Sequence, residues 1–171
     1  MGFSFGIQNF IGEDKPEKNK ITPEVQVKYR VFEETESRPA FLVGLDTQGF
    51  GPYIENAEYI RSEYIDNGDG SITTNQIVET REINRYEQKA WGMYMVVSKN
   101  WSFLGNLGLH AGLCKSISEN DDGDEDINVF FGIDKELNRS FSFLIEYDAA
   151  LNDNEYEFDD ISFGQGKGYF N

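Results

Sequence analysis

The chain has 171 residues, which suits one domain, and its formal net charge is −16 with a sequence pI near 4.3. This acidity argues against a nucleic-acid partner and against electrostatic docking on anionic lipid headgroups, because both need clustered Lys and Arg. No run of about 18 apolar residues is present, so no transmembrane helix is expected. Residues 1–5 lack the basic segment and apolar core of a secretory signal.

Alternating apolar and polar residues predict about eight strands and no helix. The clearest pattern is at 25–31, Val-Gln-Val-Lys-Tyr-Arg-Val, which gives a strand with one apolar face and one charged face. The fold class is therefore all-β. In chain order the expected strands cover residues 3–10, 25–31, 40–46, 91–99, 107–114, 128–134, 141–148 and a last segment that begins near Lys167.

The connections between these strands alternate between long and short. They cover 11–23, 33–39, 47–89, 100–106, 118–127, 135–140 and 149–166. In an antiparallel up-and-down (meander) sheet, alternate connections lie at opposite ends, so one end has tight turns and the other long loops. Outer-membrane barrels have this asymmetry. We expect a single transmembrane β-barrel domain over 1–171, with about eight strands, or a part of a larger barrel.

The longest connection, 47–89, is too long to lack structure of its own. Within it, 59–65 and 72–83 are strand-like and flank Asp-Asn-Gly-Asp-Gly at 66–70. Asn-Gly accepts positive φ at both central positions of a tight turn. The sequence predicts an extended β-hairpin here. The acidic stretches at 118–127 and 153–160 are expected to be solvated loops, because so many carboxylates do not suit a core.

In a bilayer, the outer face of a closed barrel is apolar and its inner face is polar or small. The strand pattern then gives a set of lumen-facing polar residues: Gln26, Lys28, Arg30, Asp46, His110, Asp134, Glu146 and Asp148. Aromatic residues near the strand ends are candidates for the girdles at the two interfaces. They are Phe10, Phe32, Trp91, Trp101, Phe103, Tyr147 and Tyr169.

Five stretches carry a family resemblance: Gly-Leu-Asp-Thr-Gln-Gly-Phe-Gly-Pro-Tyr at 44–53, Ser-Lys-Asn at 98–100, Leu-Gly-Leu-His-Ala-Gly at 107–112, Phe-Gly-Ile-Asp-Lys at 131–135 and Glu-Tyr-Asp at 146–148. Through them nearly the whole chain resembles a largely uncharacterised group of bacterial outer-membrane β-barrel proteins, porin-like and similar in style to exopolysaccharide-associated barrels. The resemblance implies an outer-membrane location and a precursor with a signal peptide and further strands, of which this sequence would be a fragment. It implies no agreed substrate.

Catalytic and metal chemistry has little support in the sequence. His110 and Cys114 share a strand face but lie about 13 Å apart at about 3.3 Å per residue, too far for a nucleophile and its base. Asp121, Asp122, Asp124 and Asp126 could bind Ca²⁺ or Mg²⁺ weakly, although a solvated loop explains them as well. His110 could still pair with a Ser and a carboxylate across the barrel, although nothing local in the sequence supports it. We expect no cofactor and no enzyme.

The expected function is that of a porin-like channel or a structural envelope protein with acidic surface loops. The expected partners are the lipid bilayer and lipopolysaccharide, together with an unidentified small solute and no nucleic acid. The alternative is a soluble or periplasmic antiparallel β-sandwich or lipocalin-like binding module, because the same alternation occurs in any half-buried sheet.

Overall fold

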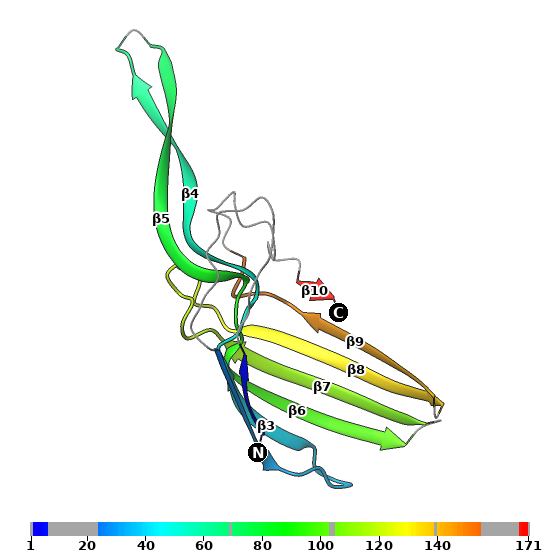
Figure 1. Cartoon of the computed structure of the whole chain (residues 1–171). Helices are drawn as coiled ribbons and strands as arrows, with labels where there is room; N and C mark the ends of the chain where they lie inside the picture. The colour runs from blue at the N-terminus through cyan, green and yellow to red at the C-terminus, as the bar shows by residue number, and fades with distance from the viewer. Residues whose placement is uncertain are drawn as a thin grey trace.

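A computed structural model of the chain describes residues 2–6, 24–68, 70–102, 105–138, 140–154 and 168–170, without the side chain of Tyr59. Within these ranges the protein has ten strands and no helix (Figure 1). The all-β prediction is confirmed. The strands are β1 (Gly2–Gly6), β2 (Glu24–Phe32), β3 (Ala40–Asp46), β4 (Phe50–Asp66), β5 (Ile72–Gln88), β6 (Gly92–Ser102), β7 (Asn106–Lys115), β8 (Asn128–Asn138), β9 (Phe141–Asp148) and β10 (Tyr169–Phe170).

Eight strands form one sheet in the order β1-β2-β3-β6-β7-β8-β9-β10, and every neighbouring pair is antiparallel. Except for the inserted β4–β5 pair, neighbours in space are neighbours in sequence, so the sheet is an up-and-down meander. In the described ranges its two edge strands, β1 and β10, do not pair with each other. The observed sheet is therefore open, and a closed barrel is not seen.

Several strands extend beyond the segments that alternation predicts. β6 and β8 each have 11 residues and β7 has 10. Ladder pairing explains the extra length, because Trp101 and Lys135 both pair with Leu107 after the apolar alternation has ended. Residues 7–10 of the first expected strand, and Lys167 and Asn171 of the last, lie outside the described residues.

The β4–β5 hairpin forms a separate two-stranded sheet of 17 residues per strand, which projects from one end of the main sheet (Figure 1). Both strands are longer than the expected 59–65 and 72–83. Gly68 and Gly70 in the connecting turn have φ of 76° and 85°, which favours glycine. The Asn67 side-chain amide donates hydrogen bonds to the hydroxyl groups of Ser71 and Thr73 and thereby holds the turn.

The most buried apolar residues lie at the base of this hairpin and not under the main sheet. Ala57 and Ile83 are 1% and 0% exposed, and Ile54 packs against them. Next to them, β5 contains a register shift opposite 54–56 and a positive φ of 42° at Asn84. A bulge of this kind bends the strand and redirects the side chains that follow it. Figure 1 shows β5 curving as it joins the sheet region.

Candidate functional site

The strand register gives the main sheet two chemically distinct faces. Residues that pair directly across an antiparallel ladder point to the same face. One such row runs from Arg30 through Leu42, Val96, Gly112 and Phe130 to Asp148. The parallel rows place all eight residues that the sequence assigns to a lumen on this one face: Gln26, Lys28, Arg30, Asp46, His110, Asp134, Glu146 and Asp148. We call it the polar face.

On the central strands β6, β7 and β8, the opposite face, which we call the apolar face, is the more exposed one. Along β7, Leu109 and Leu113 are 40% and 42% exposed, whereas Gly108 and Cys114 on the polar face are buried. On β8, Phe131 and Ile133 are likewise exposed and Gly132 between them is buried. A sheet that packs on the core of a water-soluble protein shows the reverse, with its large apolar side chains buried.

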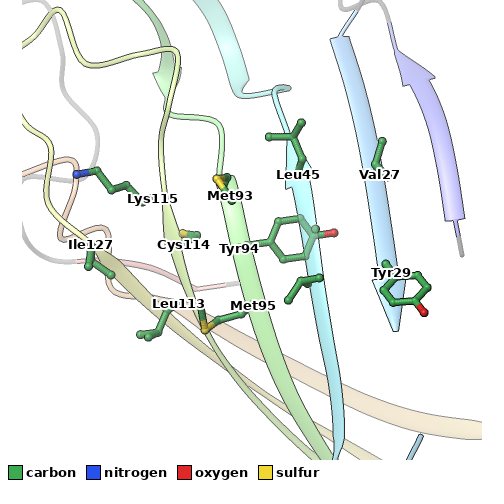
Figure 2. A pocket seen from close by; sticks show the side chains of 12 residues that line it. Val27, Tyr29, Leu45, Met93, Tyr94, Met95, Leu113, Cys114, Lys115 and Ile127 are labelled. Atoms are coloured by element: carbon green, nitrogen blue, oxygen red, sulfur yellow. The ribbon is translucent and has the colours of Figure 1, made fainter. Parts of the chain in front are cut away.

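A shallow groove of about 530 Å³ runs over the apolar face (Figure 2). Its walls come from β2, β3, β6 and β7 and from the connection before β8. Among the described residues that line it, Lys115 is the only charged one, so the groove offers almost no hydrogen-bonding groups. The lining residues are Val27, Tyr29, Val43, Gly44, Leu45, Met93, Tyr94, Met95, Leu113, Cys114, Lys115 and Ile127.

The expected aromatic girdle residues fall on both faces. Trp101 lies near the end of β6 and is 46% exposed, in the row that also contains Leu107 and Phe143 on the apolar face. Trp91 instead stacks on Phe130, with ring centroids 4.4 Å apart, and so belongs to the polar face. Phe10 and Phe103 lie outside the described residues.

His110 is the centre of a hydrogen-bonded chain across three strands of the polar face. Its Nδ1 lies 2.8 Å from Ser98 Oγ on β6, and its Nε2 lies 2.6 Å from Asp134 Oδ1 on β8. Sequence reasoning rejected a dyad with Cys114 but could not identify these partners, because they come from neighbouring strands in a register that only the structure gives. Cys114 instead accepts a hydrogen bond from Asn128 at 3.6 Å.

The Ser98–His110–Asp134 chain has two parts of a nucleophilic site, a serine next to a base and a base oriented by a carboxylate. Such chemistry also needs N–H groups placed to stabilise an oxyanion. Within the described ranges, β7 and β8 are paired on both sides along this stretch, whereas β6 is paired with β3 only as far as Ser98. Ladder bonds and the bond from the Asn100 N–H to the Glu34 carboxylate therefore use backbone N–H groups near Ser98. The three hydrogen-bonded side chains therefore fit a polar link between neighbouring strands better than a catalytic centre.

A buried cluster of charges joins the hairpin base to two loops. The Arg85 guanidinium forms ion pairs with Asp122 at 2.7 Å and with Asp153 at 2.6 Å, and Lys89 Nζ lies 2.6 Å from Asp122. All four side chains are at most 5% exposed. Burial alone would lower the pKa of Arg85, but the carboxylates of Asp153 and Asp122 outweigh it and raise that pKa, so the guanidinium stays charged.

This cluster corrects the expectation that the acidic stretches are solvated. Asp122, Asp124 and Asp153 are 4%, 4% and 6% exposed, and Glu119 is 0% exposed. Glu119 accepts hydrogen bonds from the backbone N–H groups of Tyr86 and Ala90 at 3.1 and 2.6 Å. Burial of carboxylates is tolerated here because each has a cation or an N–H donor. Residues 155–160 of the second acidic stretch lie outside the described residues.

The four expected metal ligands do not converge on one point. Asp122 is paired with Arg85 and Lys89, and an Asp121 carboxylate oxygen accepts a bond from the Asn84 amide at 2.9 Å. Asp124 accepts bonds from the N–H groups of Asp126 and Asn154 at 3.1 Å each. Asp126 contributes its backbone N–H to this arrangement. Among the described residues, no group of three His, Cys, Asp or Glu side chains is placed to hold a metal ion.

Comparison with known proteins finds no matching family model, no matching curated protein and no matching solved structure. In the part of the chain that the structure describes, no helix has the length and apolar content needed to cross a membrane.

Proposed function

We propose that the chain is an outer-membrane β-barrel protein, a porin-like channel or structural envelope protein whose eight-stranded sheet forms the barrel wall. The observation that carries the proposal is the inverted exposure of the two faces, with Leu109 and Leu113 outward and Gly108 and Cys114 covered. A lipid bilayer stabilises such a sheet, because its acyl chains contact the apolar face while water contacts the polar face.

The lengths of the three central strands support the same proposal. β6, β7 and β8 have 11, 10 and 11 residues, and a tilted spanning strand needs about 9–11. On β8 the residues whose register places them on the apolar face run from Val129 to Lys135, roughly 20 Å along the strand at about 3.3 Å per residue. This length covers most of the ~25 Å apolar band of outer-membrane barrels.

Two basic side chains lie within or beside this band on the apolar face. Lys99 Nζ extends to the carbonyl groups of Thr35 and Glu36 in the β2–β3 turn, at 2.5 and 3.0 Å. Lys135 lies near the same end of the sheet, next to Leu107. Long basic side chains that extend toward the polar interface in this way are compatible with a lipid-facing surface.

Lipid also requires that the sheet edges find partners. The order of strands from β1 to β10 makes these two edge strands antiparallel to each other, as an even-stranded barrel needs. We propose that the edges close on each other or through further strands. With about eight strands, side chains fill the interior, and a larger barrel leaves a pore. The lipid bilayer and lipopolysaccharide are the proposed partners of the outer surface and the loops.

The test is a comparison of refolding from urea into plain buffer and into detergent micelles or lipid vesicles, read by far-UV circular dichroism and by unboiled gel mobility. In a Trp91→Phe variant, Trp101 is the sole tryptophan. We expect folding only with detergent or lipid, and quenching of Trp101 by lipids brominated on their acyl chains. A cooperative, monomeric β-protein in buffer alone would overturn the proposal in favour of the soluble binding module.

A matched pair of substitutions makes this test specific for the apolar face. Val97 lies near the middle of the apolar face of β6 and is 42% exposed, and Val78 lies on the hairpin and is 57% exposed. A Lys at the bilayer midplane of a barrel costs about 2–4 kcal/mol. Val97→Lys should therefore impair insertion into vesicles, whereas Val78→Lys should insert like the unmodified chain. Equal insertion of the two variants would contradict a lipid-facing position for Val97.

A further inference from the structure

The polar face contains a second cavity, of about 300 Å³, where the main sheet meets the base of the hairpin. β2, β3, β8 and β9 contribute to it, and β6 and β7 lie between these two groups in the sheet order, so the polar face must curve around the cavity. Phe50 of β4 and Gln88 of β5 add walls from the hairpin. The volume is at the lower end of the range for small-molecule sites.

Three carboxylates and three amides give this cavity its polar lining, and no Lys or Arg is among the described residues that line it. The carboxylates are Asp46, Glu146 and Asp148, and the amides are Gln26, Gln48 and Gln88. Lys28 and Arg30 lie on the same face of the sheet but do not line the cavity. A cavity with walls of one charge sign concentrates counterions of the opposite sign.

Neutral donors hold two of these carboxylates in place without cancelling their charge. Asp46 accepts hydrogen bonds from the Gln26 amide at 2.7 Å and from the Gln48 backbone N–H at 3.0 Å. Asp148 accepts bonds from the Asn128 amide at 2.5 Å and from the Ala150 N–H at 2.9 Å. Glu146 is exposed and has no hydrogen-bond or ion-pair partner among the described residues.

The remaining wall is aromatic. Trp91 stacks on Phe130 at 4.4 Å between ring centroids with 22° between the planes, and Tyr94 packs against Trp91 in a T-shaped arrangement at 5.5 Å. Trp91 and Phe130 both line the cavity, as does Phe50. A hydrated metal ion gains little from aromatic rings, whereas an alkylammonium group is attracted to them and to carboxylates together.

We propose that this cavity is a binding site for a small organic cation that carries an alkylammonium group. The aromatic wall contacts the alkyl groups of the ligand. Glu146, which has no cationic partner among the described residues, supplies the negative charge that pairs with the ammonium group. The site lies on the polar face, so the proposal is independent of what covers the apolar face. The binding proposal can therefore fail while the outer-membrane proposal holds, and the reverse.

The test uses the full chain with Trp101→Phe, so that Trp91 is the sole tryptophan and carries a 5-fluoro label for ¹⁹F NMR. The protein is folded in dodecyl maltoside or in buffer, according to which medium supports folding. It is titrated with choline and, separately, with 3,3-dimethyl-1-butanol, which is the neutral isostere of choline. Ionic strength is held constant with NaCl. We expect a saturable shift of the Trp91 resonance with choline and at least about fivefold weaker binding of the neutral alcohol, as for a cation–π site.

Glu146→Gln is the decisive variant, because it removes the charge and keeps the shape of an exposed side chain. Glu125→Gln is its matched control, since the Glu125 side chain is 67% exposed and is outside the cavity. We expect the first to weaken choline binding by about two- to fivefold, the size expected for one solvent-accessible ion pair, and the second to leave it unchanged. The absence of a saturable shift, equal binding of the neutral alcohol, or equal effects of the two variants would each overturn the proposal.

Discussion

Arg85 and Asp153 form an ion pair of 2.6 Å across a sequence separation of 68 residues, and both side chains are almost completely buried. The pair connects the bulged part of β5 to the segment that follows β9. Asp122, from the connection between β7 and β8, binds the same guanidinium. Three segments from distant parts of the chain are thus fixed at one end of the sheet by a single side chain.

Arg85→Met should strongly destabilise this end of the molecule. It leaves Asp122 and Asp153 buried with less charge compensation, and removal of one partner from a buried ion pair costs about 3–5 kcal/mol. Unfolding by urea should shift to lower concentration, and limited proteolysis should cut near the hairpin base at lower protease concentration.

Arg81→Met is the control for this experiment. Arg81 lies on the same strand, and its Nη2 group donates an exposed hydrogen bond of 3.4 Å to the Asp121 carbonyl oxygen of the same loop. Exposed interactions of this kind are worth about 0–1 kcal/mol. If the two variants lost the same stability, the buried cluster would not be what fixes the hairpin.

Gly44 and Tyr94 form a close pair on the polar face, at directly opposed positions of β3 and β6. A Cβ atom at Gly44 would lie 2.3 Å from Cζ of the Tyr94 ring. Gly44→Ala should therefore cost about 1–3 kcal/mol, the usual range for overpacking in a filled interior. In a Tyr94→Ala background the same substitution should cost far less, a coupling that a double-mutant cycle measures.

Gly132→Ala is the matched control for the overpacking prediction. A Cβ there would have no neighbour closer than 3.6 Å, which is ordinary van der Waals contact. We expect a stability change within about 0.5 kcal/mol, as for substitutions that meet no special feature. A loss at Gly132 equal to that at Gly44 would show that β-propensity, and not the Tyr94 ring, limits both positions.

The strand pattern was sufficient to predict the fold class, because side chains alternate with period two wherever a sheet has two different faces. The segment 25–31 shows this most clearly, and it lies within β2. Strand ends were less predictable, since the ends of β6 and β8 are held by ladder bonds to neighbours and not by their own alternation. The sequence led us to expect a closed barrel, but β1 and β10 do not pair with each other in the described residues.

The buried charges could not be predicted in the same way. A carboxylate-rich loop is normally solvated, and only the approach of Arg85 and Lys89 changes the balance for Asp122 and Asp153. The bulge at Asn84 turns Arg85 into this position, and no local pattern signals a bulge. The one sequence signal was the presence of Arg85 and Lys89, two cations four residues apart in a strongly acidic chain.

Ser98 should not act as a nucleophile, although its hydroxyl is 2.8 Å from His110 Nδ1. Ladder bonds of the surrounding strands, together with the bond from the Asn100 N–H to Glu34, use N–H groups near Ser98 that an oxyanion would need. A fluorophosphonate probe should leave Ser98 unlabelled when intact protein and peptides are analysed by mass spectrometry. If Ser98 were labelled, and the labelling disappeared in a His110→Ala variant that keeps its fold, Ser98 would be an activated nucleophile and the protein would be assigned as a hydrolase.

Glu34 gives a pH-dependent prediction at the opposite end of the sheet from the hairpin. Its carboxylate accepts hydrogen bonds from the backbone N–H and the side-chain amide of Asn100, at 2.8 and 2.6 Å, and Lys99 Nζ lies 3.5 Å away. The Asn100 backbone bond, followed by its side-chain bond, lowers the pKa of Glu34 below its ordinary value of 4.5. Its contribution to stability is thus present above the unfolded-state pKa and is lost as the pH falls through the lower folded-state pKa.

The pKa of Glu34 can be measured by ¹³C NMR of the labelled carboxyl carbon in the folded chain, with the urea-unfolded chain as its reference. We expect the folded midpoint to lie at lower pH than the unfolded one. Asn100→Ala should move the folded midpoint only part of the way back, because the backbone N–H at position 100 still donates. A folded midpoint at or above the unfolded one would mean that Asn100 does not hold the Glu34 carboxylate, and that the β2–β3 turn is free of β6 in solution.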